Sequence, residues 1–253
     1  MQLSFQLYSA RNFQPWPELL AMLAEAGYAR VEGFGGVYED PAGFRALLDQ
    51  NGLSMPSGHF SMDALENDFD GAMNTASALG IERVFCPHID VASRPVDSAG
   101  WRDFAGRLAA IGEKVRATGR RFGWHNHDFE FRRLGDDGVP MQIILDAAPE
   151  IDWEADIAWI IRGGGDPGEW IGRHGSRITA VHVKDIAPEG ESMDEDGWAD
   201  VGHGTVDWAN LFKQLKAGSQ TALYVMEHDK PSDAKRFATR SIDWVKKTVG
   251  QQA

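Results

Sequence analysis

Apolar and polar positions along the chain follow one pattern that repeats eight times. Each repeat begins with a short apolar run rich in β-branched or aromatic residues, continues through a polar residue and a loop, and ends in an amphipathic stretch with helical spacing. Several helical stretches begin at proline or end at glycine, as helices often do. The expected strands cover residues 3–8, 28–34, 53–60, 81–87, 122–131, 151–157, 177–183 and 221–226. The expected helices cover residues 15–26, 41–51, 64–79, 98–118, 140–148, 167–174, 207–217 and 232–248.

An alternation of strands and helices with short connections predicts a parallel sheet covered by helices. Eight such units are the number that closes a (β/α)8 TIM barrel, and the length of 253 residues is typical of that α/β fold. No linker or low-complexity tract interrupts the pattern. We therefore predict a single barrel domain over residues 1–253.

Polar side chains end most of the expected strands. In a TIM barrel the carboxyl ends of the strands meet at one face, where active sites lie. The residues concerned are Glu32, His59, His125, Asp156, His182 and Glu227. Each of these residues, taken alone, could instead be a buried structural residue that only forms hydrogen bonds with its neighbours. Their shared position at one barrel face favours a functional site.

The expected fifth strand, 122–131, carries the densest group of ligand-capable side chains. His125, His127, Asp128 and Glu130 fall within six positions. In an extended strand His125 and His127 project to the same face, so two imidazoles from one strand would point at a shared place. A pair of structural histidines would have the same spacing.

Charge and composition exclude several classes of protein. The formal net charge is −13, from 38 acidic and 25 basic residues, and no basic cluster offers a track for phosphates. No apolar segment approaches the roughly 18 residues of a membrane span. The single cysteine, Cys86, excludes an internal disulfide and a Cys-rich zinc site. The start of the chain lacks signal-peptide features, so we expect a cytoplasmic protein without nucleic-acid or membrane partners.

Five motifs, taken in order, resemble the sugar isomerases and epimerases of the xylose isomerase-like TIM barrel family, which has endonuclease IV-like cousins. They are His-Asn-His-Asp-Phe-Glu-Phe at 125–131, Glu-Ala-Asp-Ile-Ala-Trp at 154–159, Val-His-Val-Lys-Asp at 181–185, Val-Gly-His-Gly-Thr-Val-Asp-Trp at 201–208 and Met-Glu-His-Asp at 226–229. Each motif is weak alone, but their order and spacing span most of the chain. The resemblance implies an enzyme of carbohydrate metabolism with a small sugar substrate, and it is compatible with a homodimer.

The resemblance also implies one divalent metal ion, often manganese, held by Glu, Asp, His and Glu on strands five to eight. This chain has His125, Asp156, His182 and Glu227 there, so strand five departs from the family pattern. Such a mixed site suits Mn²⁺, Co²⁺, Fe²⁺ or Zn²⁺ better than Mg²⁺ or Ca²⁺. If Glu227 is also the catalytic base, a second proton-transfer group is expected at His125, or at His127 or Glu130 if His125 binds the ion.

Further residues near the strand ends are expected to contact the substrate. They are Glu32, His59, His127, Trp159 and Lys184. Trp159 would stack on a sugar ring, although aromatic side chains are more often packing residues. Lys184 would bind a substrate oxygen or phosphate, but a snorkelling lysine or one ion-paired beside Asp185 is an equal alternative.

Three functions from different classes fit these residues. The leading one is a metal-dependent isomerase or epimerase that removes a proton next to a carbonyl of a sugar, keto-sugar or sugar phosphate; a keto-sugar or inosose dehydratase or lyase would share that first step. The second is an endonuclease IV-like phosphodiesterase, which the acidic charge disfavours. The third is a catalytically silent sugar-binding barrel.

Overall fold

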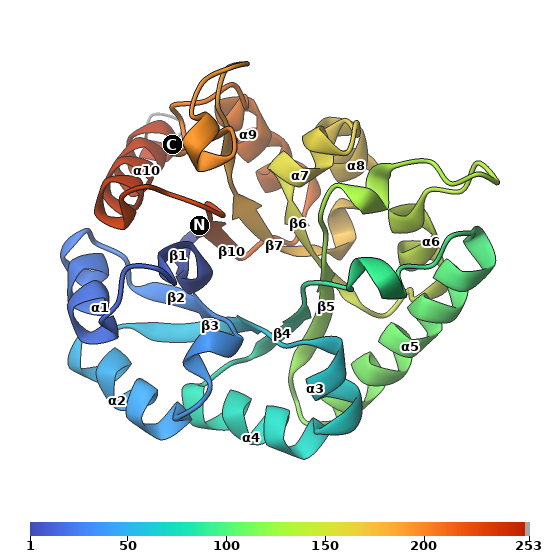
Figure 1. Cartoon of the computed structure of the whole chain (residues 1–253), viewed down its shortest axis with the longest axis horizontal. Coiled ribbons are helices and arrows are strands. Elements are labelled where there is room, and N and C mark those ends of the chain that lie inside the picture. Colours follow the sequence, from blue (N-terminus) through green and yellow to red (C-terminus); the bar gives the residue numbers. More distant parts are fainter. Residues whose placement is uncertain (251–253) are drawn as a thin grey trace.

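Eight parallel strands close into a barrel in the computed structural model, which describes residues 1–250. Around the barrel the strand order is β1-β10-β7-β6-β5-β4-β3-β2, and β1 pairs with both β2 and β10 to close the ring (Figure 1). The predicted (β/α)8 TIM barrel is therefore confirmed. The barrel strands are β1 Gln2–Gln6, β2 Arg30–Gly33, β3 Ser54–His59, β4 Arg83–Cys86, β5 Arg121–His125, β6 Asp152–Asp156, β7 Ile178–Val183 and β10 Leu223–Met226.

Helices surround the barrel on the outside (Figure 1). Several begin at an aspartate whose carboxylate accepts a backbone N–H of the first turn, as Asp40, Asp97 and Asp166 do. None of the helices within residues 1–250 is both long and apolar enough to cross a membrane. The helices are α1 Trp16–Glu25, α2 Pro41–Gln50, α3 Met62–Asn67, α4 Phe69–Leu79, α5 Ser98–Ala117, α6 Pro140–Ala147, α7 Ile157–Arg162, α8 Pro167–His174, α9 Trp208–Gly218 and α10 Ala234–Gly250.

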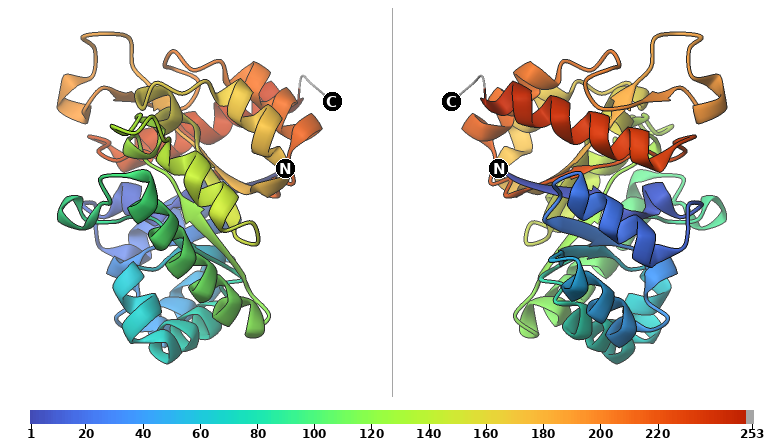
Figure 2. Two further views of the ribbon diagram at one scale, coloured as in Figure 1. Left: turned by 90° about the vertical axis from the view of Figure 1, so that its right-hand side faces the viewer. Right: turned by 90° about the vertical axis from the view of Figure 1, so that its left-hand side faces the viewer.

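The structure corrects the sequence prediction at three places. The helix expected over 64–79 is two helices, because Asp68 leaves helical geometry and its carboxylate caps α4 through Gly71 N–H. Helix α7 follows β6 directly, in a segment where no helix was expected from the sequence. A two-stranded antiparallel ribbon, β8 Asp185–Ile186 with β9 Trp198–Ala199, follows β7 and was not predicted. Figure 2 shows the loop that joins these two strands, in orange, projecting at the end of the barrel away from the N terminus.

The fifth strand is also shorter than predicted. It ends at His125, and the chain then turns into a 3₁₀ helix over Phe129–Phe131. The expectation that His125 and His127 share one strand face is therefore wrong, because His127 lies beyond the strand.

The barrel interior divides into an apolar part and a polar part. Phe85, Ala180, Leu223 and Val225 form a small apolar cluster inside the ring, separate from the large core between strands and helices. The remaining interior positions toward the carboxyl ends of the strands hold buried polar and charged side chains. This polar half of the barrel is the floor of the candidate site.

Candidate active site and metal centre

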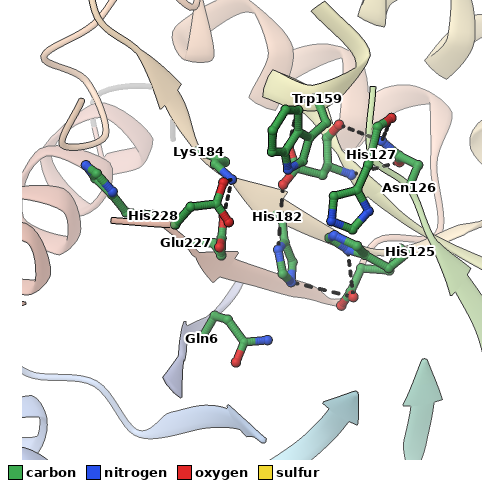
Figure 3. A network of polar contacts seen from close by, with 12 residues as sticks. Gln6, His125, Asn126, His127, Trp159, His182, Lys184, Glu227 and His228 are labelled. Atoms are coloured by element: carbon green, nitrogen blue, oxygen red, sulfur yellow. Dashed lines mark hydrogen bonds and ion pairs between the residues drawn. The ribbon is translucent and has the colours of Figure 1, made fainter. Parts of the chain in front are cut away.

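A cavity of about 790 Å³ opens at the carboxyl ends of the barrel strands. Its floor includes the polar strand ends Gln6, His59, His125, His182 and Glu227, and its walls include the aromatic side chains Tyr8, Phe34, Tyr38, Phe60 and Trp159. Figure 3 shows His125 and His127 on one side of His182, Glu227 and Lys184 on the other, and Trp159 above it. Sequence positions from all around the barrel thus meet in one hollow.

Asp156, His182 and Glu227 come together at the carboxyl ends of β6, β7 and β10. One ligand atom from each lies within 4.8 Å of the others, and all three residues are at most 5% exposed. Asp156 Oδ2 lies 3.8 Å from His182 Nδ1. Neither atom has a hydrogen-bond partner within residues 1–250. Buried polar atoms are rarely left in this state, so the donor set fits a divalent cation.

Asp156 is held in place by the end of strand β5. Asn126 Oδ1 accepts a hydrogen bond from Asp156 N at 3.0 Å, and Asn126 Nδ2 donates to Asp156 O at 3.1 Å. The other carboxylate oxygen of Asp156 accepts from Trp159 N at 2.9 Å, which caps α7. The unpaired Oδ2 is thereby fixed in direction, as a metal ligand requires.

His125 belongs to an adjoining set of side chains. His59, His125, Glu154 and His182 offer ligand atoms within 4.8 Å of one another, so His182 is common to both sets. Glu154 Oε2 is central, at 2.7 Å from His59 Nε2, 3.2 Å from His125 Nδ1 and 3.5 Å from His182 Nε2. Glu154 was not among the predicted site residues, although its two-residue spacing from Asp156 places both side chains on one strand face.

Glu32 lies beneath these histidines and away from the cavity. Its carboxylate accepts hydrogen bonds from Gln6 Nε2 at 2.8 Å and from Ser57 Oγ, and it lies 2.7 Å from His182 Nε2. Burial opposes its charge, but His59 and His182 hold the pKa of Glu32 well below its usual value. This placement favours a supporting role over the substrate contact expected from the sequence.

Lys184 is fully buried beside Glu227. Its Nζ lies 2.8 Å from Glu227 Oε2, forms an ion pair with Asp229, and sits over the rings of Trp159 and Trp198 at 4.7 and 4.0 Å. Lys184 is therefore ion-paired, as one of the two expectations from the sequence held, but its partners are Asp229 and Glu227 and not Asp185. Burial and Asp229 raise the pKa of Glu227 to about 7, against the opposing charge of Lys184.

Glu130 and His127 lie in the turn that follows β5. Glu130 is fully buried, and its two oxygens accept hydrogen bonds from Trp124 Nε1 at 3.0 Å and His127 N at 2.9 Å. These contacts favour an anchoring role for Glu130 over the catalytic role suggested by the sequence. His127 lines the cavity, where burial lowers its pKa to about 3 and keeps the ring neutral.

Comparison with known proteins identifies the family of this chain. The family model described as xylose isomerase-like TIM barrel matches residues 20–248, and the chain belongs to that family. The rhizopine catabolism protein MocC of Rhizobium meliloti is 24% identical over 263 residues, which cover 87% of this chain and 77% of that protein.

Two solved structures share the fold over nearly the whole chain. A sugar phosphate isomerase/epimerase from Parabacteroides distasonis is 22% identical with a TM-score of 0.79, covering 96% of this chain and 93% of its own. The IolI protein, solved with a bound zinc atom, is 15% identical with a TM-score of 0.78, covering 99% and 97%. At these identities the likeness establishes the fold.

Proposed function

We propose that this member of the xylose isomerase-like TIM barrel family is a divalent-metal-dependent sugar isomerase or epimerase. The observation that carries the proposal is the convergence of Asp156, His182 and Glu227 at the cavity floor, with two buried ligand atoms unpaired within the described residues. The reaction would begin with removal of a proton next to a carbonyl group.

Asp156, His182 and Glu227 would hold the cation, which would stabilise the negative charge that develops on the substrate oxygens. Their mixture of carboxylates and imidazole suits Mn²⁺, Co²⁺, Fe²⁺ or Zn²⁺ better than Mg²⁺ or Ca²⁺. Among these, manganese is favoured by the family resemblance.

Glu227 is the best-placed base among the described residues. It is a carboxylate on the cavity floor, and its pKa, raised to about 7 by burial and by Asp229, is matched to proton transfer at neutral pH. One such base suffices to move a proton between adjacent carbons of the substrate, whereas epimerisation needs a second proton-transfer group on the opposite face of the substrate. His125 and His127 line the cavity on the side of His182 that lies away from Glu227, so either could be this second group (Figure 3).

The cavity favours an uncharged sugar over a sugar phosphate. Among the described lining residues Arg107 is the one arginine or lysine, and its guanidinium is paired with Glu66 at 2.7 Å. Against it stand the carboxylates of Asp63 and Asp90, while Glu66 is paired with Arg107, and Glu227 and Asp229 are paired with Lys184. A phosphate group would meet this negative field without a free cationic side chain, while the aromatic walls suit the faces of a sugar ring.

Hydrogen exchange in D₂O tests the reaction class before the product is known. Protein loaded with Mn²⁺ would be incubated with a panel of ketoses, aldoses and inososes, each with and without a phosphate where both exist. We expect deuterium at the carbon next to the carbonyl of at least one unphosphorylated sugar, and none with Glu227→Gln. Metal-loaded protein that binds a sugar without any exchange would contradict the proposal and support a silent sugar-binding barrel.

A dehydratase or lyase is the second candidate, because it shares the proton abstraction by Glu227. The same incubation distinguishes a dehydratase from an isomerase or epimerase, because loss of one water molecule gives a product about 18 mass units lighter than the substrate. Isomerisation and epimerisation leave the mass unchanged apart from the deuterium.

A further inference from the structure

The cavity at the carboxyl ends of the strands is larger than one sugar ring requires. Its volume of about 790 Å³ lies in the upper part of the range of about 300–1,000 Å³ in which drug-sized ligands bind. A monosaccharide is smaller than such ligands, whereas two linked sugar rings approach their size. The cavity therefore has room for a second ring beside the sugar that reacts.

The extra space lies across the barrel from the candidate metal ligands. Asp156, His182 and Glu227 stand at the carboxyl ends of β6, β7 and β10, whereas the far part of the cavity is lined by the segments that follow β3 and β4. In the closed ring β3 stands opposite β7, and β4 stands opposite β10 (Figure 1). We call this far part the distal groove. It is lined by Met62, Asp63, Pro87, Ile89, Asp90 and Ser93.

The two ends of the cavity differ in their exposure to solvent. On the floor the side chains of His182 and Glu227 are 2% and 6% exposed. In the distal part the side chains of Asp90 and Arg107 are 89% and 52% exposed. A substrate would therefore enter with its reacting end first and leave its other end in the distal groove.

The distal groove combines apolar surface with oxygen acceptors. Met62, Pro87 and Ile89 offer apolar contacts to the C–H face of a sugar ring. The carboxylates of Asp63 and Asp90 can accept hydrogen bonds from sugar hydroxyl groups. One oxygen of Asp63 accepts a hydrogen bond from Asn67 Nδ2 at 2.8 Å, and a carboxylate has further acceptor sites.

The charge of the distal groove favours a neutral group over an anionic one. Arg107 on α5 is held by Glu66 on α3 through two hydrogen bonds of 2.8 and 2.7 Å, so its guanidinium is already neutralised. The carboxylates of Asp63 and Asp90 would repel a phosphate or an acidic sugar. Hydroxyl groups, which donate hydrogen bonds, suit these carboxylates.

We propose that the substrate is a reducing disaccharide, with its reducing sugar on the cavity floor and its second ring in the distal groove. This inference rests on the isomerase or epimerase function proposed above, because that function decides which end of the sugar reaches the floor. The reaction takes place at the first two carbons of an aldose or ketose. A second ring linked at the fourth or sixth carbon therefore points away from the ligands on β6, β7 and β10. The glycosidic bond stays intact, and the second ring contributes binding alone.

A comparison of single sugars with disaccharides tests the distal groove. Protein loaded with Mn²⁺ would be given glucose and fructose, and the disaccharides maltose, cellobiose, lactose, melibiose and lactulose, whose reducing sugar is glucose or fructose. Deuterium exchange in D₂O measures kcat/KM, and isothermal titration calorimetry measures Kd without turnover. We expect at least one disaccharide to exceed its own reducing sugar by about 10-fold or more in kcat/KM and to bind more tightly, since a hydrogen bond to a charged group contributes about a factor of 10.

Two pairs of variants locate this preference in the distal groove. Ser93→Trp fills the groove from an exposed position, and its control, Ala92→Trp, adds the same side chain at an exposed neighbour outside the cavity lining. Asp63→Ala removes an acceptor from the first turn of α3. Its control, Asp70→Ala, removes an acidic residue from the first turn of α4, so both variants lose the same favourable charge at a helix N terminus.

The measured quantity is the ratio of kcat/KM for the disaccharide to kcat/KM for its reducing sugar. We expect this ratio to fall to about 1 in Ser93→Trp and at least about threefold in Asp63→Ala, and to stay unchanged in both controls. Circular dichroism establishes that each variant is folded.

The outcomes separate the distal groove from the proposed reaction. Equal kcat/KM and equal Kd for disaccharides and single sugars in the wild type would overturn the groove assignment and leave the proposed function intact. A preference that survives in both Ser93→Trp and Asp63→Ala would also overturn it. Tighter binding of a disaccharide that is lost in Ser93→Trp, without deuterium exchange from any sugar, would support the groove and overturn the proposed reaction. Absence of both binding and exchange with every sugar would overturn both.

Discussion

Glu227 combines burial, a lysine partner and a position on the cavity floor. As a base it acts when ionised, so kcat/KM should fall as the pH is lowered through about 7, the pKa set by burial and Asp229, and a bound cation moves this limb to lower pH. Glu227→Gln keeps the shape of the side chain and removes the base, so we expect turnover to fall at least about 10²-fold. Steady-state kinetics measures the turnover of Glu227→Gln and of a control variant, Glu39→Gln, in which an exposed glutamate is changed in the same way. Equal turnover in the two variants would exclude Glu227 as the base.

His59 and His182 connect the site to stability. Burial opposes their charge, but Glu32 and Glu154 raise the pKa of His59 to about 10 and that of His182 to about 9. An unfolded histidine titrates near 6.5, so without metal the folded protein binds extra protons above that pH. The stability they add is full below about pH 6.5 and is lost as the pH rises through 9 to 10.

Chelator-treated protein should therefore show a falling melting temperature between pH 7 and 10. Metal-loaded protein should show a smaller fall, because a cation bound to His182 replaces the extra proton on that ring. Thermal melts followed by circular dichroism at several pH values measure both slopes. Identical slopes with and without metal would show that His182 is not at a metal site.

Among the elements, the turn after β5 depends on one buried carboxylate. Glu130 accepts hydrogen bonds from Trp124 Nε1 and His127 N, so Glu130→Ala leaves two donors unpaired. We expect a loss of about 1–3 kcal/mol in the free energy of unfolding, together with a higher KM because His127 loses its position. The neighbouring Asp128→Ala removes an ion pair with the exposed Arg132 and should cost about 0–1 kcal/mol.

Urea denaturation of the metal-loaded protein compares the two variants directly. If Asp128→Ala destabilises the protein as much as Glu130→Ala, the anchoring role assigned to Glu130 is wrong. An unchanged KM in Glu130→Ala would show that the turn after β5 does not position His127 for substrate binding.

The same turn marks where sequence-based prediction of elements fails. The alternation of 122–131 continues past His125, so periodicity alone extends the strand. Beyond His125 the chain turns so that Glu130 accepts the backbone N–H of His127 and the indole N–H of Trp124, and the alternation of apolar and polar residues does not reveal these side-chain contacts. Asp68 gives the converse case, since an aspartate inside a helical pattern both ends α3 and caps α4.

The barrel itself was predictable, because eight strand–helix units admit few closed arrangements. The fold also brought together the strand-end residues Asp156, His182 and Glu227, as their positions at the ends of strands required. The sequence could not predict that His125 lies beside Glu154 while His182 lies near both Glu154 and Asp156, since this depends on ring orientation inside the barrel. Glu154 was visible in the sequence only as a second polar residue on the face of Asp156.

At the scale of the whole molecule, charge bears on the class of substrate that the protein could bind. The chain carries a formal net charge of −13, and the cavity mouth is lined by more carboxylates than cationic side chains. Binding of nucleic acid depends on clustered lysine and arginine that replace the counterions of the phosphates. The same field that disfavours a sugar phosphate in the cavity therefore disfavours a phosphodiester track across it.

We accordingly expect no measurable binding to an abasic-site DNA duplex at physiological salt, even though the protein shares its barrel with endonuclease IV-like proteins. A gel shift with protein loaded with Zn²⁺ or Mn²⁺ measures binding, and denaturing electrophoresis of the same reactions detects incision. Repeating the assay at about 0.05 M salt strengthens any electrostatic attraction and provides a stringent form of the test. Incision that requires metal and disappears in Asp156→Asn would replace the sugar isomerase proposal with a phosphodiesterase. Weak binding at low salt without incision would only reflect the basic residues scattered over the surface and would leave the assignment of a sugar substrate in place.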